Sequence, residues 1–330
     1  KVKRMRSVIC SKFGPPESLS IQIQTDLYPS NGQVRIAIEA CGVNFPDTLI
    51  IQDKYQFKPD LPFAPGGEVA GKVDMIGDGV TDFKIGDSVM AMTLSGGFSE
   101  QIIIDAAALL RRPNNMDSIT AAGFTMTYGT SMHALKQRAN LKKGESLLVL
   151  GAGGGVGLAA VEIGVALGAV VIAAASSSEK LHAAKKAGAT YLINYAEENL
   201  RDSIKEIIGK DGVDVVYDPV GGDLFEAALR STSWRGRVLV VGFASGSIPK
   251  IPVNLTLLKG CAVVGVFWGA FRLKETALDN ENFEQLFSWY NEEKIRPLIS
   301  RSYPLEDAAK ALRAITNREA IGKIVLTTGI

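Results

Sequence analysis

The sequence predicts an α/β protein in which a parallel, helix-covered sheet is inserted into a mostly β domain. Two observations predict this class. Between residues 147 and 241, short apolar runs alternate with helical segments, whereas before residue 120 short segments are broken by Gly and Pro. Continuous apolar strands between helices are typical of a parallel sheet buried on both faces. Short strands separated by turns are typical of antiparallel β structure.

The N-terminal part is predicted to be a compact β domain. Turn sequences such as Gly77-Asp78-Gly79 separate its expected strands, which are 34–38, 69–76, 88–92 and 101–104. A largely helical stretch, 117–138, is expected to lead into the parallel sheet. After Gly265 the alternation stops, and the remaining elements are expected to return the chain to the β domain: helices 281–290 and 305–315 and strand 323–326.

The middle of the chain is predicted to form the parallel sheet with its helices. The expected strands are 147–150, 170–174, 191–193, 213–217 and 238–241. The expected helices between them are 158–167, 180–187, 201–208 and 224–229. The predicted domain boundaries are therefore 1–124 together with 268–330 for the β domain, and 125–267 for the inserted domain.

A glycine-rich turn joins the first strand of this sheet to its first helix. Gly151, Gly154 and Gly157 stand three residues apart. This spacing allows a sharp turn, admits a pyrophosphate against bare amides, and lets the helix pack close to the strand. The helix N-terminus then presents N–H groups and a positive dipole to the phosphates. Because strands and helices alternate around it, the turn predicts dinucleotide binding rather than a plain tight loop.

Composition excludes several classes of protein. The 330 residues suffice for two domains, and 36 basic against 35 acidic residues give a net charge of +1, so neither a nucleic acid nor a membrane partner is expected. The three cysteines, Cys10, Cys41 and Cys261, are far apart, which disfavours a disulfide framework. The basic start, Lys1 to Arg6, has no apolar run behind it as a signal peptide would. A reducing, cytoplasmic location is expected.

Several segments in a fixed order carry a resemblance to a known family. They span nearly the whole chain: 42–47, 65–71, 86–89, 97–100, 128–130, 151–157, 193–195, 218–222 and 322–323. Together they resemble the medium-chain dehydrogenase/reductase superfamily, and within it the zinc-independent quinone oxidoreductase branch of zeta-crystallin-like proteins. The resemblance implies a central Rossmann dinucleotide-binding domain inserted into a mostly β, GroES-like catalytic domain. It also implies a homodimer that pairs through the Rossmann domains.

The chain departs from the zinc-dependent members of this superfamily. Those enzymes place a cysteine where this chain has Asn44 and a histidine where it has Gly67, so that only Glu68 remains. Asparagine and glycine cannot supply the thiolate and imidazole of a catalytic zinc site. No metal is therefore expected. Without a Lewis acid, reduction of an electron-poor acceptor is favoured over oxidation of an alcohol.

The end of the second predicted strand indicates the cofactor. NAD-specific Rossmann domains usually hold an acidic residue there, but this strand is followed by Ser176, Ser177 and Ser178. Small neutral residues leave room for a 2′-phosphate, and the resemblance implies that Lys180 and Tyr195 contact it. The alternative is that Ser178 only caps the next helix and Lys180 is a solvated surface charge. We expect NADPH rather than NADH.

The resemblance also implies the residues at the reacting end. Asn44, Asp47 and Tyr55 of the β domain are the expected catalytic residues. The expected cofactor-binding residues are Thr130, Gly151, Gly154, Gly155, Val156, Gly157, Ser176, Ser177, Lys180, Tyr195, Gly242, Phe243, Phe267, Trp268 and Lys323. Core packing is an equal alternative for Phe243 and Phe267, and Lys323 could either contact a phosphate or be a strand-edge charge.

These features predict a zinc-independent, NADPH-dependent oxidoreductase that reduces quinones by hydride transfer from nicotinamide C4. The alternative acceptor is the double bond of an enone, an alkenal or an enoyl thioester, because hydride again adds at a conjugated carbon. A remote alternative is a cofactor-binding protein with a structural or RNA-binding role. The balanced charge argues against RNA.

Overall fold

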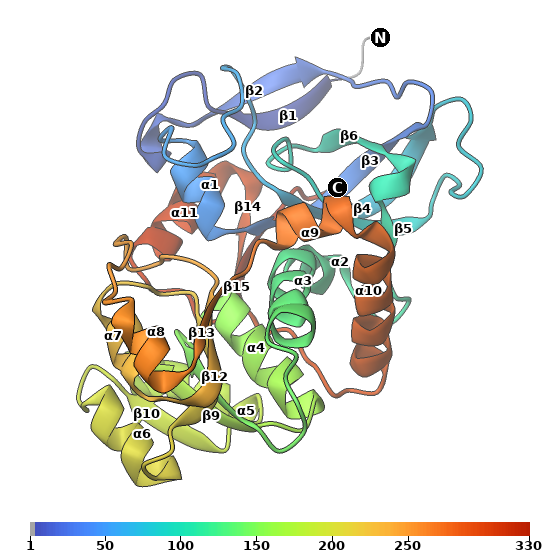
Figure 1. Ribbon diagram of the computed structural model, residues 1–330. Helices are drawn as coiled ribbons and strands as arrows, with labels where there is room; N and C mark the ends of the chain where they lie inside the picture. Colours follow the sequence, from blue (N-terminus) through green and yellow to red (C-terminus); the bar gives the residue numbers. More distant parts are fainter. Residues whose placement is uncertain (1–3) are drawn as a thin grey trace. The chain divides into compact units, whose positions relative to one another are not determined.

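The computed structural model describes residues 4–330, which divide into two compact units (Figure 1). The first unit runs to Met126 and resumes at Leu298–Ile330, and the second is Thr127–Pro297. The beginning of the basic segment Lys1 to Arg6 lies outside the described residues. None of the helices within 4–330 is both long enough and apolar enough to cross a lipid bilayer.

The first unit is built on β strands. A seven-stranded sheet has the order β14-β15-β3-β4-β5-β7, with β6 paired to β3, and β1 and β2 form a separate antiparallel pair. The strands are β1 (Arg4–Ile9), β2 (Ser20–Thr25), β3 (Gln33–Val43), β4 (Glu68–Ile76), β5 (Ser88–Met92), β6 (Gln101–Asp105), β7 (Leu110–Arg111), β14 (Ile299–Pro304) and β15 (Lys323–Thr327). The helices are α1 (Phe45–Ile50), α2 (Ser118–Ala122) and α11 (Ala308–Thr316).

The C-terminal tail completes this sheet, as the sequence predicts. β15 pairs antiparallel with β3 and parallel with β14, so Ile324 lies opposite Val43. Alternating residues of β3 and β15 enter one apolar core with the buried face of α11, and Ile36, Ile38, Leu312 and Ile324 are all inaccessible to solvent. The first unit therefore needs both ends of the chain.

The second unit contains a six-stranded parallel sheet of the order β10-β9-β8-β11-β12-β13. Its strands are β8 (Ser146–Leu150), β9 (Val170–Ala175), β10 (Tyr191–Asn194), β11 (Val213–Asp218), β12 (Thr232–Val240) and β13 (Ala262–Gly265). Its helices are α3 (Thr125–Met132), which begins at the unit boundary and continues as a π-helical segment (His133–Arg138), α4 (Gly155–Ala166), α5 (Ser178–Lys186), α6 (Leu200–Ile208), α7 (Asp223–Arg230), α8 (Asn254–Lys259), α9 (Trp268–Lys274) and α10 (Thr276–Asn291).

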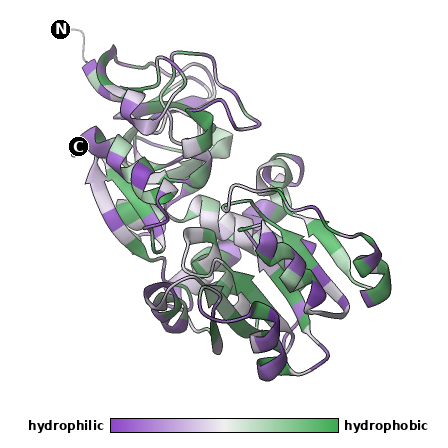
Figure 2. Cartoon of the chain, turned by 90° about the vertical axis from the view of Figure 1, so that its left-hand side faces the viewer, coloured by the Kyte–Doolittle hydropathy of each residue, from purple (hydrophilic) through white to green (hydrophobic). Residues whose placement is uncertain are grey.

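The central strands β8, β9 and β11 of the parallel sheet are buried on both faces, which explains their largely apolar sequences (Figure 2). Side chains alternate between faces along a strand. Leu148 and Leu150 share a core cluster with residues of α6, α7 and α8, whereas Leu147 packs against Gly164 of α4. The predicted combination of a Rossmann sheet with a mostly β domain is confirmed, and the sequence did not predict β13, the edge strand.

The boundary between the units differs from the predicted one. The sequence assigns residues from 268 onward to the β domain, but α9 and α10 belong to the second unit. Two contacts fix them there. The indole N–H of Trp268 donates to Asp279 at 2.7 Å, and the amides of Asn282 and Gln137 exchange hydrogen bonds of 2.9 and 3.0 Å. The return to the first unit therefore comes at Leu298.

Candidate functional site

The glycine-rich turn after β8 has the close packing that its spacing predicts. Gly151 has a φ of +59°, a backbone conformation that favours glycine. A Cβ atom on Gly157 would lie 2.2 Å from the carbonyl oxygen of Gly151, so only glycine allows α4 to approach the turn. Gly154 is the N-cap of α4 and uses no side chain to satisfy the first N–H groups. The turn, with Gly155 and Val156 in the first turn of the helix, thus offers bare amides to an anion.

Two residues tie α3 and β11 to this turn. The hydroxyl of Ser131 donates to the carbonyl oxygen of Val156 at 2.9 Å and lies 2.8 Å from the buried phenol of Tyr217. Thr130 precedes Ser131 on α3 and is half-buried. The contact of Thr130 with the nicotinamide stays a prediction.

The carboxyl end of β9 gathers the residues predicted to select the cofactor. Tyr195 donates its N–H to the carbonyl oxygen of Ala175, the last residue of β9. Lys180 packs against the turn, because a Cβ atom on Gly153 would lie 2.4 Å from that of Lys180. Ser177, rather than Ser178, caps α5 and accepts the N–H of Lys180 at 3.4 Å, while Ser176 is exposed. Small hydroxyl residues and a lysine therefore stand where NAD-specific domains hold a carboxylate.

A buried carboxyl group organises the neighbouring strand end. Asp218, the last residue of β11, accepts hydrogen bonds from the N–H groups of Val220 and Gly221 at 2.7 and 2.9 Å. Burial raises the pKa of Asp218, against the opposing effect of these two N–H groups. Phe243, after β12, packs on the same loop, because a Cβ atom on Gly221 would lie 3.0 Å from its ring. The sequence prediction omitted Asp218 as a site residue, although its place after an apolar strand and before two glycines was visible.

Two of the predicted aromatic residues have different surroundings. Trp268 is buried, with its indole against Gly129 and Phe283 and its N–H bound to Asp279, so it serves the packing of the second unit. Phe267, by contrast, is 64% exposed. Gly242 follows β12 at the same sheet edge as Phe243. The cofactor contacts of these residues stay predictions, and the packing gives Trp268 a structural role.

In the first unit, four polar side chains meet in the interior. β3 ends at Val43, and α1 starts immediately after Asn44, whose N–H donates to Asp47 at 2.8 Å. The carboxylate of Glu68, at the start of β4, accepts the side-chain amide of Asn44 at 3.0 Å and the N–H of Met126 at 2.8 Å. Lys323, the first residue of β15, donates to Glu68 at 3.2 Å. We call Asn44, Asp47, Glu68 and Lys323 the polar cluster.

The surroundings of the polar cluster alter its acid–base behaviour. Burial raises the pKa of Asp47 to about 7, although the Asn44 N–H and the Lys323 ammonium oppose this effect. Burial, reinforced by Asp47, also raises the pKa of the Tyr55 phenol. The three predicted catalytic residues thus lie in one region of the first unit, and Asp47 has a pKa suited to proton transfer near neutrality.

Lys323 does not have the geometry predicted for a phosphate contact. Its ammonium lies 3.1 Å from the carbonyl oxygen of Val43 and also binds Asn44 and Glu68. An ammonium has three donors, and these bonds use all three. The predicted phosphate contact is therefore corrected to an internal role.

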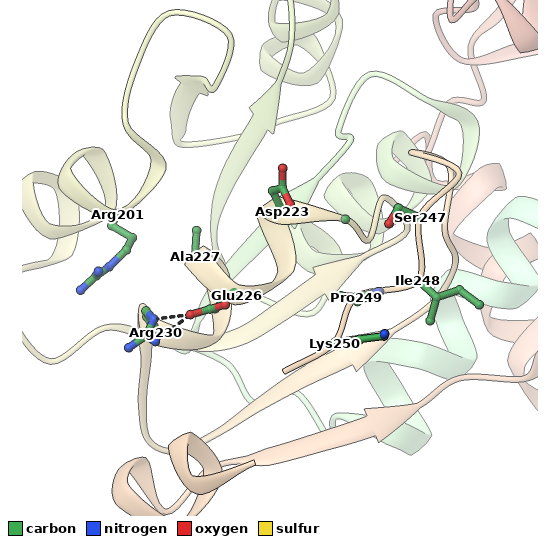
Figure 3. A pocket seen from close by; sticks show the side chains of 10 residues that line it. Arg201, Asp223, Glu226, Ala227, Arg230, Ser247, Ile248, Pro249 and Lys250 are labelled. Atoms are coloured by element: carbon green, nitrogen blue, oxygen red, sulfur yellow. Dashed lines mark hydrogen bonds and ion pairs between the residues drawn. The ribbon is translucent and has the colours of Figure 1, made fainter. Parts of the chain in front are cut away.

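A separate surface hollow of about 580 Å³ lies on the second unit (Figure 3). It is lined by residues of α6, α7 and the segment after β12: Arg201, Gly222, Asp223, Glu226, Ala227, Arg230, Ser247, Ile248, Pro249 and Lys250. Its charges are mixed, and Arg230 pairs with Glu226 at 2.6 Å. None of the predicted site residues lines it.

Comparisons with known proteins agree with this architecture. The family model described as "Alcohol dehydrogenase GroES-like domain" matches residues 30–114, and the one described as "Zinc-binding dehydrogenase" matches residues 155–291. The quinone oxidoreductase-like protein 2 homolog of Nematostella vectensis is 37% identical over 328 residues, covering 99% of this chain and 90% of that protein. The quinone oxidoreductase of Rattus norvegicus is 36% identical, covering 98% of both chains. The chain belongs to the medium-chain dehydrogenase/reductase superfamily, in its quinone oxidoreductase-like branch.

Solved structures of relatives share the whole fold. The Escherichia coli quinone oxidoreductase complexed with NADPH superposes with a TM-score of 0.89 at 31% identity, covering 98% of this chain and 99% of that one. A mycobacterial protein complexed with NADPH gives a TM-score of 0.90 at 30% identity, with the same coverage. The resemblance stated from the sequence motifs is thus confirmed, and the chain is an oxidoreductase.

The zinc in the name of one matching family does not fit the residues present. The positions that hold ligands in zinc-dependent relatives carry Asn44 and Gly67, and the ammonium of Lys323 already contacts Glu68. Within residues 4–330, no group of three or more His, Cys, Asp or Glu side chains could hold a metal ion. Asn44 and Lys323 therefore fill the place beside Glu68 with hydrogen-bond donors.

Proposed function

We propose that this oxidoreductase reduces quinones with NADPH and without zinc. The observation that carries the cofactor choice is the end of β9, where Ser176, Lys180 and Tyr195 follow the strands and the first carboxylate, that of Glu179, comes only inside α5. A cationic and hydroxyl-rich surface favours a 2′-phosphate over a ribose hydroxyl. Two structural relatives solved as complexes with NADPH support the same choice.

In this proposal the second unit binds the cofactor. The amides of Gly155 to Gly157 receive the pyrophosphate at the N-terminus of α4, and Lys180 and Tyr195 receive the 2′-phosphate. Thr130, Gly242 and Phe243 orient the nicotinamide, and Phe267 lies at the same sheet edge. When bound, the cofactor supplies a hydride from nicotinamide C4, so the work of the protein is to position the ring and exclude water.

A quinone suits the polar cluster of the first unit. A quinone is already electron-poor, so its reduction needs no metal to polarise it. The Tyr55 phenol and the protonated Asp47 carboxyl can donate hydrogen bonds to the oxygens of the acceptor, Asn44 can orient the cofactor beside them, and the reduced quinone can take its protons from water. The names of the relatives from Nematostella vectensis and Rattus norvegicus support this substrate class.

A second candidate is reduction of an enone, alkenal or enoyl thioester, and one observation favours it. Such a reaction needs a proton donor for the enolate carbon that forms. The pKa of Asp47, raised by burial to about 7, would let that carboxyl hold a proton at neutral pH. Tyr55, close enough for its own pKa to respond to Asp47, could deliver it.

We also propose a homodimer formed through the edge of the parallel sheet. Among the strands of residues 4–330, β13 pairs with β12 alone, and it carries Val263, which is 38% exposed. Trp234, Leu257 and Leu258 beside it are 67–78% exposed. An uncovered apolar strand edge is a surface that proteins normally protect by pairing. Light scattering should give a dimer mass for the unmodified protein and a monomer mass for Leu258→Arg.

An acceptor screen tests the proposed activity. NADPH oxidation is followed with naphthoquinone, an alkenal and an enoyl thioester, each at several concentrations. The proposal predicts the highest kcat/KM for the quinone. Faster turnover of the alkenal or the thioester would establish the second candidate, and NADPH binding with no turnover of any acceptor would favour a structural role instead.

A further inference from the structure

The backbone around Lys323 directs its side chain into the first unit. Gly322, just before β15, has a φ of +68°, and a Cβ atom there would lie 2.3 Å from the carbonyl oxygen of Leu298. The side chain of Lys323 runs past Gly123, on which a Cβ atom would come within 3.2 Å of Lys323 Cβ. A buried ammonium is tolerated only where its donors are satisfied.

The three donors of this ammonium end on three acceptors. They are the carbonyl oxygen of Val43 at 3.1 Å, Asn44 Oδ1 at 2.5 Å and Glu68 Oε2 at 3.2 Å. Lys323 therefore has no N–H left for a substrate or a phosphate. Any influence on a ligand must pass through the residues that it holds.

Lys323 and Glu68 form hydrogen bonds with the two ends of the Asn44 carboxamide. Oδ1 accepts from the ammonium, while Nδ2 donates to Glu68 Oε2 at 3.0 Å. Rotating the carboxamide by half a turn would set its NH₂ group against the ammonium and its oxygen against the carboxylate. Both contacts would then be repulsive, so the two charges fix a single orientation.

These two hydrogen bonds determine which atom of the Asn44 carboxamide can bind a ligand. The second Nδ2 hydrogen points toward the carbonyl oxygen of Gly42, 3.5 Å away, whereas Oδ1 keeps one lone pair after accepting from Lys323. Gly42 itself must lack a side chain, because a Cβ atom there would lie 2.5 Å from Glu68 Oε2. The oxygen is the end of the carboxamide with remaining capacity.

We propose that Lys323 is a positioning residue that holds the oxygen of Asn44 toward the ligand, so that this point of the site selects a hydrogen-bond donor such as a hydroxyl or an amide N–H. Asn44 then binds a donor group, such as a ribose hydroxyl or the carboxamide N–H of NADPH, and does not contact a carbonyl oxygen of the quinone. The kinetic part of this inference rests on the proposed function, whereas the orientation of Asn44 does not.

A double-mutant cycle tests the kinetic part. Lys323→Met with Glu68→Gln removes both charges together and avoids leaving a buried carboxylate unpaired. In an assay with naphthoquinone and NADPH, this double variant is expected to have a kcat/KM that is lower by roughly ten- to a hundredfold, the range of a lost charge-assisted contact. Adding Asn44→Ala should cost less than about threefold more, because the oriented carboxamide is already lost.

Two kinetic results would refute the positioning role of Lys323. If the pair of substitutions keeps kcat/KM, or if Asn44→Ala still costs its full factor in that background, the positioning role is refuted. Lys310→Met, on the exposed face of α11, is the matched control and should change nothing. Should the pair fail to fold, Lys323→Arg decides: a loss under about tenfold supports the proposal, and a loss as large as that of Asn44→Ala overturns it.

An activity-independent measurement separates this inference from the proposed function. In protein labelled with nitrogen-15 asparagine, the side-chain amide signal of Asn44 is identified by its disappearance in Asn44→Ala. The signal should be single in the unmodified protein and should shift or broaden in Lys323→Met with Glu68→Gln. If the Asn44 signal were unchanged in this double variant, the proposed orientation of Asn44 by Lys323 and Glu68 would be contradicted, even in a protein that reduces no quinone.

Discussion

Gly157 lies so close to Gly151 that a Cβ atom on it would come within 2.2 Å of the Gly151 carbonyl oxygen. The first turn of α4 therefore rests directly on the end of β8. Gly154, between them, has a different environment, because a Cβ atom there would meet its nearest neighbour at 3.6 Å. One glycine serves packing, and the other keeps space open above the helix N-terminus.

This contrast predicts different outcomes for two alanine substitutions. Gly157→Ala should destabilise the protein by roughly 1–3 kcal/mol, the usual cost of overpacking. Gly154→Ala should change stability by about 1 kcal/mol at most, yet weaken NADPH binding on the order of tenfold by obstructing the phosphates. Urea unfolding and fluorescence titration measure the two effects. Equal losses of stability would contradict this division of roles.

The raised pKa of Asp47 predicts a pH-dependent stability. A carboxyl group has a pKa near 3.9 when unfolded, and that of folded Asp47 is about 7. Between these values the folded state binds more protons, so the contribution of Asp47 to stability falls as the pH rises through this window. The difference in unfolding free energy between Asp47→Asn and the unmodified protein should therefore favour Asp47→Asn more at about pH 8 than at about pH 4.

Urea midpoints at the two pH values measure this effect. Asp60→Asn, which alters an exposed carboxylate of the same unit, is the control and should show the pH dependence of the unmodified protein. If Asp47→Asn kept that same dependence, Asp47 would titrate in the folded state as it does in the unfolded chain.

The catalytic residues predict a contrast between two further variants. An obligatory proton donor typically contributes 10²–10⁴-fold, so Tyr55→Phe would be severe if Tyr55 had that role. With quinones we expect a smaller loss, because water can supply the protons, and a larger loss with enones. Asn44→Ala should weaken ligand binding more than Tyr55→Phe does. Steady-state kinetics with both acceptors test this, and a thousandfold loss with quinones would refute catalysis by positioning alone.

The pattern of side chains around Glu68 predicts a protein that works without zinc. Elemental analysis of the purified protein should find well under one zinc per chain, and treatment with a chelator should leave kcat unchanged. We expect no zinc because the contact between Lys323 and Glu68 places an ammonium beside the carboxylate that would otherwise bind the metal. Stoichiometric zinc that is lost together with activity would overturn the assignment.

The parallel sheet and its glycine-rich turn could be predicted because their signals are local. A strand, a turn and a helix within residues 146–166 contain all three of the spaced glycines. The same holds for Ser176, Lys180 and Tyr195, which follow consecutive strands and must meet at one sheet edge. The cap of α5 could not be assigned from the sequence, because adjacent serines are equivalent there and only the helix start distinguishes Ser177.

The polar cluster could not be predicted in the same way. Asn44 and Lys323 are 279 positions apart and become neighbours only because β15 pairs with β3. A lysine at a strand start resembles a surface charge until Gly322 and Gly123 are seen to admit it to the interior. The boundary at 268 failed for a related reason, since an amphipathic helix such as α10 does not indicate in its own sequence which unit covers its apolar face.

Lys180 offers the most direct test of the preference for NADPH in quinone reduction. We measure kcat/KM for NADPH and for NADH with one quinone, in the unmodified protein, in Lys180→Glu and in Lys186→Glu, an exposed control on the same helix. The unmodified protein should prefer NADPH, and Lys180→Glu should lose roughly ten- to a hundredfold with NADPH while NADH changes little. Equal use of both cofactors by the unmodified protein, or an equal loss in both lysine variants, would contradict the account.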